Sequence, residues 1–328
     1  AIEVKTGRRL QTAAIASSSG YLGGVPSRAH FGLGSETRAD YIRLTWPDAA
    51  LQSELEVPAD QRWQITKAAR KASSCPVLFA WGGSRFQFIT DFLGVGGLGF
   101  FVAPGTYAPP DPTEDVRVPP QLVAPRGGRY EFRIAEPLEE ATSLDEVHLI
   151  AYDHPSGWEV HPDERFPGSP PLPTGRPFAV ERKVFPAAAR TDRGDAVLSE
   201  ILEIDRRYVE PPVDPRFPGY ASDHWLELDF GERLRSVPPG ARLVLYLYGW
   251  VEYTYSHVNF AAYQAGLSLH PPSIEVPGAD GGWNVAIEDA GFPAGLPRMM
   301  TLDITSLPIR EDGPIRIRTN MQIYWDQI

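Results

Sequence analysis

The sequence predicts an all-β protein built from several β-sandwich domains. Its 328 residues include 33 prolines and 30 glycines, and proline is excluded from helix interiors and central strands. Short runs in which polar and apolar residues alternate recur about every 8–15 residues, with turn residues between them. A single segment has the apolar spacing of an amphipathic helix. Together these features favour short strands joined by long loops.

The first 72 residues predict a small β domain. Polar and apolar residues alternate over 41–46 and again over 63–65, and a short aromatic strand is expected over 30–34. Residues 66–74 are polar and basic, and we expect them to link this domain to the next one.

A β-hairpin is predicted at residues 77–89. Apolar residues precede Gly82-Gly83, an alternating strand follows, and the glycine pair supplies the turn. Strands are also expected over 130–134 and 146–152. The proline-rich stretches on either side of these strands are expected to be irregular.

The C-terminal part combines a predicted helix with a series of strands. Apolar residues at i, i+4, i+7 and i+11 predict a helix over 197–208, and they are Val197, Ile201, Ile204 and Tyr208. The strands that follow are expected near 225–228, 241–255, 267–269, 283–287, 299–304 and 315–324. We predict three domains, at 1–72, 73–188 and 189–328, and the last is similar to a jelly-roll or galactose-binding-like sandwich.

Glycines bracket a short aromatic stretch near the N-terminus. The residues are Gly20-Tyr21-Leu22, then His30 to Gly34, and then Trp46-Pro47 after a second strand. This spacing resembles the ASPIC/UnbV domain, found at the C-terminus of secreted or periplasmic proteins with FG-GAP propeller repeats, including the cartilage acidic protein group. The resemblance implies an extracytoplasmic, non-catalytic accessory role and gives no reaction.

Later segments are similar to the region that follows this domain in long bacterial FG-GAP and TPR proteins. They are residues 91–94, 107–111, 249–251, 262–267 with 271–272, 291–295 and 319–328. The resemblance therefore covers nearly the whole chain, without propeller repeats or TPR helices. Because the chain begins with Ala1-Ile2 and no methionine, we expect a processed chain or a piece of a longer one.

Charge and composition narrow the partners and the compartment. The net charge is −11, and residues 1–72 carry +3, so the remainder is strongly acidic. Nucleic acid is therefore not an expected partner. Cys75 is the only cysteine, and no run of about 18 apolar residues predicts a transmembrane segment. The resemblance to secreted proteins predicts a secreted, periplasmic or cell-surface location.

An aromatic run predicts the ligand-binding surface. If a one-residue bulge occurs at Gly249-Trp250, the tyrosines before and after it share one face of a strand. Such a platform suits stacking on sugar rings, whereas packing inside the core is the competing interpretation. The candidate binding residues are Tyr246, Tyr248, Trp250, Tyr253, Tyr255, His257 and Asn259.

Possible metal ligands gather on a loop in the middle of the chain. They are Asp153, His154, His161 and Asp163, followed by Glu164. Carboxylates and imidazoles can hold zinc or calcium, but the spacing of known sites is missing. Asp111, Glu114 and Asp115 form a second acidic loop that lacks the EF-hand pattern. No cofactor is predicted, and calcium is left open.

The glycine-rich loop from Leu93 to Phe101 is a candidate contact with another chain. Its glycine spacing is like that of a dinucleotide-binding loop, but proline-rich sequence follows in place of a helix. Apolar glycine-rich loops let backbones pack closely. We therefore expect this loop to pack against a neighbour in an oligomer.

These features predict a binding and scaffolding module outside the cytoplasm, with a role in adhesion or assembly. Its ligand would be a carbohydrate or another protein. One alternative is a structural subunit of a homo- or hetero-oligomer that binds no small molecule. A carbohydrate-active hydrolase is the third reading, because two distant carboxylates could meet in the fold.

Overall fold

The computed structural model is all-β, as predicted. Its strands form six sheets, and the described part of the chain contains one α-helix. The structure describes residues 1–16, 28–47, 51–67, 76–92, 100–108, 113–136, 143–166, 173–238, 240–307, 309 and 313–328. The predictions for Gly20-Tyr21-Leu22, Cys75, Asp111 and most of the Leu93–Phe101 loop lie outside these residues.

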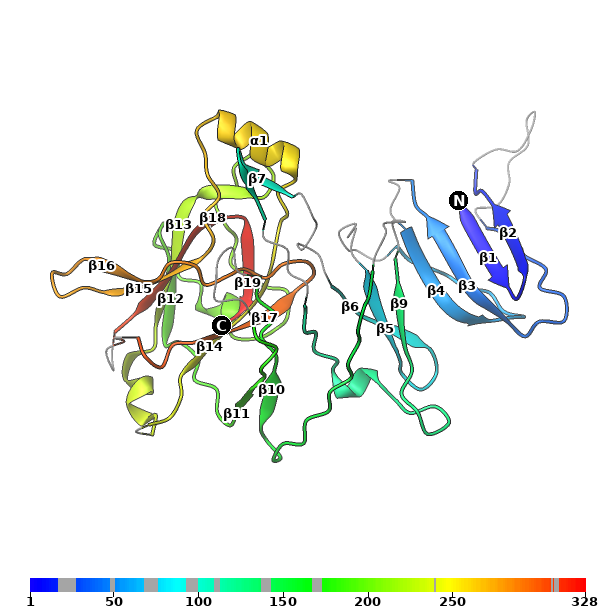
Figure 1. Cartoon of the computed structure of the whole chain (residues 1–328), viewed down its shortest axis with the longest axis horizontal. Helices are drawn as coiled ribbons and strands as arrows, with labels where there is room; N and C mark the ends of the chain where they lie inside the picture. The colour runs from blue at the N-terminus through cyan, green and yellow to red at the C-terminus, as the bar shows by residue number, and fades with distance from the viewer. Residues whose placement is uncertain are drawn as a thin grey trace. The chain divides into compact units, whose positions relative to one another are not determined.

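The chain divides into two compact units (Figure 1). Unit 1 comprises Ala1–Phe92 and Val118–Asp145, and unit 2 comprises Leu93–Arg117 and Glu146–Ile328. Each unit is therefore made of two stretches of chain that are separated in the sequence.

Unit 1 begins with a four-stranded antiparallel sheet in the order β2-β1-β3-β4. Its strands are β1 (Ile2–Thr6), β2 (Arg9–Ala13), β3 (Arg38–Thr45) and β4 (Leu51–Pro58). The buried side chains Val4, Ala39 and Val57 form a small core. Burying so few apolar side chains stabilises this sheet only modestly.

A second sheet in unit 1 has the order β6-β5-β9. Its strands are β5 (Val77–Trp81), β6 (Phe86–Asp91) and β9 (Phe132–Ala135), and a 3-10 turn, η1 (Pro120–Leu122), precedes β9. The β5–β6 hairpin is the one predicted from Gly82-Gly83, and Gly83 has a φ of 98°. Leu55 of β4 packs against the core of this sheet, so the two sheets of unit 1 touch.

Unit 2 contains a five-stranded sheet, β12-β13-β18-β15-β16, and a three-stranded sheet, β17-β14-β19. The first consists of β12 (Ala188–Thr191), β13 (Tyr220–Asp229), β18 (Ile315–Met321), β15 (Ser273–Pro277) and β16 (Trp283–Ile287). The second consists of β17 (Arg298–Asp303), β14 (Val244–Val251) and β19 (Ile323–Gln327). All the strand pairs in both sheets are antiparallel.

Smaller elements complete unit 2. They are β7 (Phe101–Ala103), β8 (Thr106–Tyr107), β10 (Glu159–His161), β11 (Phe178–Val180), η2 (Leu198–Ile201), η3 (Gly231–Ser236) and α1 (Ser256–Gln264). β7 pairs with β8, and β10 pairs with β11, in two-stranded ladders.

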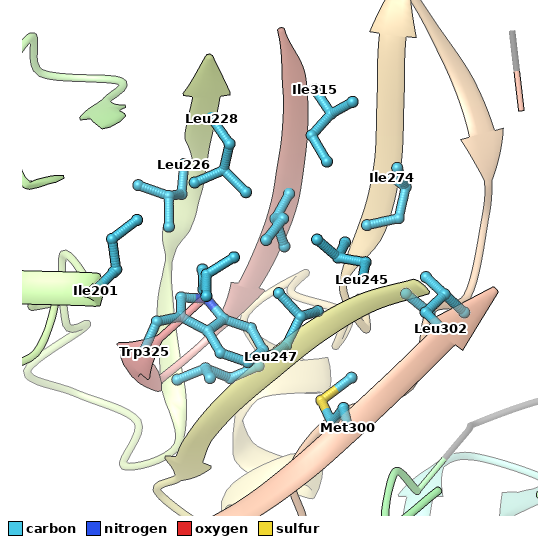
Figure 2. Close-up of a cluster of buried hydrophobic side chains, with 14 of the residues drawn as sticks. Ile201, Leu226, Leu228, Leu245, Leu247, Ile274, Met300, Leu302, Ile315 and Trp325 are labelled. Carbon is cyan, nitrogen blue, oxygen red and sulfur yellow. The ribbon is translucent and has the colours of Figure 1, made fainter. Parts of the chain in front are cut away.

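One apolar core holds the two large sheets of unit 2 together. In β14 every second residue is buried, so Leu245, Leu247 and Val251 face this core and the tyrosines face away from it. Figure 2 shows core side chains of both sheets pointing into the shared interior. The labelled ones are Ile201, Leu226, Leu228, Leu245, Leu247, Ile274, Met300, Leu302, Ile315 and Trp325.

The opposite face of the five-stranded sheet carries paired charges. Glu227 of β13 is buried and accepts hydrogen bonds from Arg190 of β12 and Arg316 of β18, at 2.8 and 2.9 Å. The Arg316 guanidinium also lies 3.8 Å from the ring centroids of both Trp225 and Trp283. These cross-strand contacts stabilise the sheet.

The predicted helix over 197–208 is wrong. Only η2 is helical there, and Arg206 adopts a left-handed φ of 68° that ends any helix. Ile201 is buried in the core, whereas Ile204 is exposed. The apolar spacing therefore marks the points at which an irregular segment touches the core.

Several strand predictions are also wrong. The structure assigns no strand over 30–34, 63–65, 146–152 or 267–269. The strand expected over 241–255 is β14, which ends at Val251, and α1 begins five residues later. A local alternating pattern does not guarantee a partner strand, and without one no ladder forms.

Candidate binding site around helix α1

Helix α1 ends in a Schellman motif. Gly266 has a φ of 80°, its N–H donates to the Tyr263 carbonyl, and the Leu267 N–H donates to the Ala262 carbonyl at 2.9 Å. Leu267 also packs against the buried cluster of Tyr220, Val258 and Ala262. The glycine and the apolar residue after it are the sequence signature of this helix end.

A buried asparagine fixes the helix to the β7–β8 hairpin. The Asn259 side chain is 0% exposed, and its Oδ1 accepts hydrogen bonds from the hydroxyls of Tyr220 and Thr254, at 2.9 and 2.7 Å. Its Nδ2 donates to the Phe101 carbonyl at 2.8 Å, and the Ser256 hydroxyl accepts from the Phe101 N–H at 3.2 Å. Both backbone groups of Phe101 are therefore held by α1, which lies beside β7 (Figure 1).

Exposed aromatic side chains gather around this junction, which we call the α1 patch. The Phe101 ring contacts the rings of Tyr107 and Phe260, with centroids 6.2 and 5.9 Å apart. The rings of Tyr255 and His257 stack at 5.7 Å. The α1 patch consists of Phe101, Tyr107, Tyr255, His257, Phe260 and Tyr263, and its four exposed tyrosine and phenylalanine side chains are 48–59% exposed.

The α1 patch carries no charge. Helix α1 has the sequence SHVNFAAYQ, and the β7–β8 hairpin has the sequence FVAPGTY. Neither contains a lysine, arginine, aspartate or glutamate. Aromatic rings with hydroxyl and imidazole groups between them can stack on flat apolar faces and exchange hydrogen bonds with a neutral ligand.

The structure separates the predicted binding residues into three places. Tyr246, Tyr248 and Trp250 lie together on the outer face of β14, but all three are half-buried. The register shift lies between Tyr248 and Gly249, where β19 contributes an extra residue, so no bulge in β14 brings the later tyrosines onto this face.

The outer face of β14 is occupied by other side chains. The Trp250 ring stacks on Tyr324 at 5.5 Å and meets the edge of Tyr208 at 4.8 Å. The Tyr246 ring meets His161 at 5.2 Å. Burial raises the pKa of the hydroxyls of Tyr246 and Tyr248.

The remaining predicted residues follow β14. Tyr253 is partly buried against the core, and Asn259 is the buried anchor described above. Tyr255 and His257 are exposed and belong to the α1 patch. Sequence reasoning missed Phe101, Tyr107, Phe260 and Tyr263, because β7 and α1 are about 150 residues apart in the chain.

The predicted metal ligands do not form one cluster. Asp153 and His154 are exposed, whereas His161 and Asp163 are buried. Within the part of the chain that the structure describes, no group of three or more histidine, cysteine, aspartate or glutamate side chains is placed to hold a metal ion.

The buried carboxylates near His161 cover the free edge of β17. Glu164 accepts hydrogen bonds from the N–H groups of Arg117 and Met299, at 2.9 and 3.2 Å. Asp163 accepts from the Arg165 guanidinium at 2.7 Å and from the Thr301 N–H. Burial raises the pKa of both carboxyls. The two carboxylates thus accept hydrogen bonds from N–H groups on the edge of β17. Without them, these N–H groups could pair with another strand.

His161 belongs to a small buried polar group. Its Nε2 lies 3.1 Å from the Glu159 carboxylate, and burial lowers the pKa of the imidazole. Among the described residues its Nδ1 has no hydrogen-bond partner, and neither has the Tyr246 hydroxyl nor the Thr301 hydroxyl. Buried polar atoms of this kind are commonly satisfied by an internal water.

A small cavity lies at one end of the five-stranded sheet. Its volume is about 10 Å³, which is space for one water molecule. It is lined by residues that include Thr191, Pro211, His224, Trp225 and Trp325. A sugar ring does not fit there, so this cavity does not compete with the α1 patch.

Residues 1–72 match the family model described as ASPIC and UnbV. This match confirms the resemblance predicted from the spacing of Gly20, His30 and Trp46-Pro47, and it places an ASPIC and UnbV domain at the N-terminus. No curated protein and no solved structure matches the chain. Among the described residues, no helix has the length and apolar character needed to cross a membrane.

Proposed function

We propose that this protein is a non-catalytic binding module that acts outside the cytoplasm and holds a neutral carbohydrate at the α1 patch. The observation that carries this proposal is the group of half-exposed aromatic rings on α1 and the β7–β8 hairpin. Large aromatic side chains are mostly buried for packing. A cluster that stays exposed on a buried, hydrogen-bonded support is typical of a recognition surface.

Three features favour a carbohydrate over a charged ligand. Both elements of the α1 patch lack charged side chains. The tyrosine hydroxyls and His257 offer hydrogen bonds at the rim, and the ring faces suit stacking on pyranose rings. The ASPIC and UnbV domain at residues 1–72 is consistent with secreted, periplasmic or cell-surface location and with an adhesion role.

The proposed fold of unit 2 is a β-sandwich of jelly-roll or galactose-binding-like type. Its two large antiparallel sheets share one core, which supports this assignment. In such an arrangement the loops and small elements at the sheet ends are free to carry ligand sites.

The test is a glycan-array screen followed by titration of the neutral glycan that binds. Phe260→Ala and Tyr107→Ala are each expected to weaken binding roughly tenfold, because each removes about 1.4 kcal/mol of stacking. Tyr152→Ala is the matched control, since Tyr152 is equally exposed but lies outside the α1 patch. Running the screen with calcium and with EDTA tests the calcium prediction.

Absence of any neutral-glycan binding would overturn the proposal. So would a Tyr107→Ala/Phe260→Ala double variant that binds as tightly as the wild type while remaining folded. Equal loss in the Tyr152→Ala control would show that the measured binding does not come from the α1 patch.

A second candidate function is a structural subunit of an assembly, and the segment 146–152 favours it. The segment was predicted as a strand, but it belongs to no sheet in the described part of the chain. Its Val147, Leu149 and Ile150 side chains are 58–69% exposed. Exposed β-branched and apolar residues of this kind can add a strand to the sheet of a neighbouring chain.

Light scattering tests the assembly directly. If the segment pairs with a second chain, the wild type should be oligomeric at micromolar concentration. Ile150→Asp should then shift it to monomer, and that monomer should remain folded, because Ile150 is exposed in the single chain. A wild type that is monomeric at these concentrations would contradict self-assembly.

A further inference from the structure

Three arginines surround one carboxylate in unit 1. Glu56 of β4 accepts hydrogen bonds from Arg133 of β9 and from Arg126, both at 3.1 Å, and from Arg38 of β3 at 3.4 Å. We call these four residues the Glu56 cluster. Arg126 and Arg133 are 70 and 77 residues from Glu56 in the sequence, and the fold brings them together at the contact between the two sheets of unit 1.

Two of the three guanidinium groups of the Glu56 cluster lie over aromatic rings. Arg126 lies 4.3 Å from the Trp81 ring centroid, and Arg133 lies 4.5 Å from that of Phe86. These cation–π contacts orient a guanidinium without using its N–H donors. The cluster therefore presents pre-oriented donors.

The backbone around Arg126 is rigid as well. Gly127 and Gly128 both have left-handed φ values, 57° and 76°, and the Arg126 and Arg129 backbones exchange two hydrogen bonds across them. This is the geometry of a two-residue hairpin turn, which needs positive φ at both central positions. Arg126 thus projects from an ordered turn.

The Glu56 cluster has more positive than negative charge. Besides Glu56, the only carboxylate recorded against these three arginines among the described residues is Glu131, 3.4 Å from Arg126. Glu56 is 9% exposed, whereas the three arginines are all partly exposed. Each guanidinium uses a single nitrogen for these carboxylates and has five N–H donors in total. Among the described residues, no carboxylate is bonded to the remaining donors, and the proposed ligand would use these donors.

The backbone of Glu56 is strained. Its φ is 49° within a strand, a left-handed conformation that is unfavourable for a residue other than glycine. Strain of this kind persists where surrounding contacts over-determine it, and it concentrates at functional sites. Here it places one carboxylate at the centre of three arginines.

We propose that the Glu56 cluster binds the sulfate or carboxylate groups of an acidic polysaccharide. Arginine presents paired N–H donors that match the oxygens of both groups. The proposal rests on the proposed function in that the ligand is again a carbohydrate, but it concerns a different site in a different unit. It would make the protein a two-site binder, with a neutral site in unit 2 and an anionic site in unit 1.

The charge of unit 1 favours a sparsely charged polymer. Unit 1 carries 14 lysines and arginines against 13 aspartates and glutamates, and unit 2 carries 17 against 29. Nucleic acid has a charge about every 1.7 Å and is bound by broad basic surfaces. A single cluster of three arginines fits a polymer with one oxyanion on each sugar, and the exposed Tyr130, beside Glu131, offers a ring for stacking.

The experiment measures binding of the full chain to polygalacturonate, to a dextran sulfate with a single sulfate on each glucose, and to uncharged dextran. We expect binding to one or both charged polymers and none to dextran, with affinity falling as salt is added. Arg38→Gln/Arg133→Gln should weaken binding roughly tenfold or more, because two charge-assisted contacts are lost. The matched control Arg8→Gln/Arg62→Gln removes two exposed arginines of the same unit and should leave binding unchanged.

Glu56→Gln separates a ligand site from a purely structural network. The substitution removes the carboxylate that competes with the ligand, so affinity for the acidic polymer should rise severalfold although unit 1 becomes less stable. A network that only joins the two sheets predicts no gain. If the Arg38→Gln/Arg133→Gln variant does not fold, the single Arg38→Gln variant replaces it in the binding measurement, since Arg38 is the most exposed of the three arginines.

Four results would overturn the proposal. They are no binding to either charged polymer, no gain in affinity in folded Glu56→Gln, equal binding by wild type and folded Arg38→Gln, and an equal loss in the Arg8→Gln/Arg62→Gln control. Phe260→Ala should leave binding to acidic polymers unchanged. The experiments can therefore refute the proposal for the α1 patch without refuting the proposal for the Glu56 cluster. They can equally refute the second proposal without the first.

Discussion

Gly219→Ala is expected to destabilise unit 2 by roughly 3–5 kcal/mol. Gly219 has a φ of 93°, and a Cβ there would lie 2.6 Å from the Thr254 nitrogen and 2.7 Å from its Cβ. The left-handed backbone accounts for about 1–3 kcal/mol of the loss, and overpacking accounts for a similar amount. Both sides of this contact are held in place: the Gly219 N–H and carbonyl both bond Gln322, at 3.1 and 3.0 Å, and the Thr254 hydroxyl donates to buried Asn259 at 2.7 Å.

Gly194→Ala is the matched control. Gly194 has nearly the same φ, 85°, but a Cβ there would have nothing within 4 Å. Gly194→Ala should therefore lower the free energy of unfolding only by the cost of the left-handed backbone, about 1 kcal/mol. Urea denaturation of both variants gives the two free energies of unfolding, and their difference measures the close approach at Thr254. Equal losses would show that no steric clash occurs there.

Local patterns predicted the elements that depend on local chemistry. The β5–β6 hairpin forms because the sequence around Gly82-Gly83 supplies both the turn and two alternating strands. β14 and β18 lie within predicted strands, since their alternating apolar residues face the core of unit 2. The match to the ASPIC and UnbV family was likewise carried by a local spacing.

The helix was missed because its residues continue an aromatic run. The alternating pattern predicted a single strand over 241–255. Helix α1 has only a weak apolar pattern, because the side chain that fixes it to the fold, Asn259, is polar. Asn259 and Ser256 hold the helix by hydrogen bonds to Phe101, a residue about 155 positions earlier. Residues that far apart in the sequence do not produce the regular spacing from which helices and strands are predicted.

Long-range contacts also explain why the candidate sites were found only in part. Tyr255 and His257 were named from the aromatic run, whereas Tyr107 joins the α1 patch only through the β7–β8 hairpin. The Glu56 cluster draws on three strands and a turn. Arginine and glutamate are common, so their convergence can be seen only in the folded chain.

Asn259→Ala is expected to cost roughly 3–5 kcal/mol and to weaken ligand binding at the α1 patch. The substitution leaves the buried hydroxyls of Tyr220 and Thr254 and the Phe101 carbonyl without the partner that Asn259 supplies. An unsatisfied buried polar group costs about 1–3 kcal/mol. The functional loss follows because the hairpin that carries Tyr107 is no longer fixed against α1.

Two further variants test whether Asn259 supports binding by fixing the β7–β8 hairpin against α1. Gln264→Ala changes an exposed residue of the same helix and should leave both stability and binding unchanged. Ser256→Ala removes only the acceptor for the Phe101 N–H, so it should cost about 1 kcal/mol and weaken binding less than Asn259→Ala does. If the affinity of the folded Asn259→Ala variant for the neutral glycan equalled that of the wild type, Asn259 would stabilise the fold without positioning the α1 patch. Affinities that fall in the order Gln264→Ala, Ser256→Ala, Asn259→Ala would instead show that the hydrogen bonds from Ser256 and Asn259 to the Phe101 backbone position the aromatic side chains of the α1 patch.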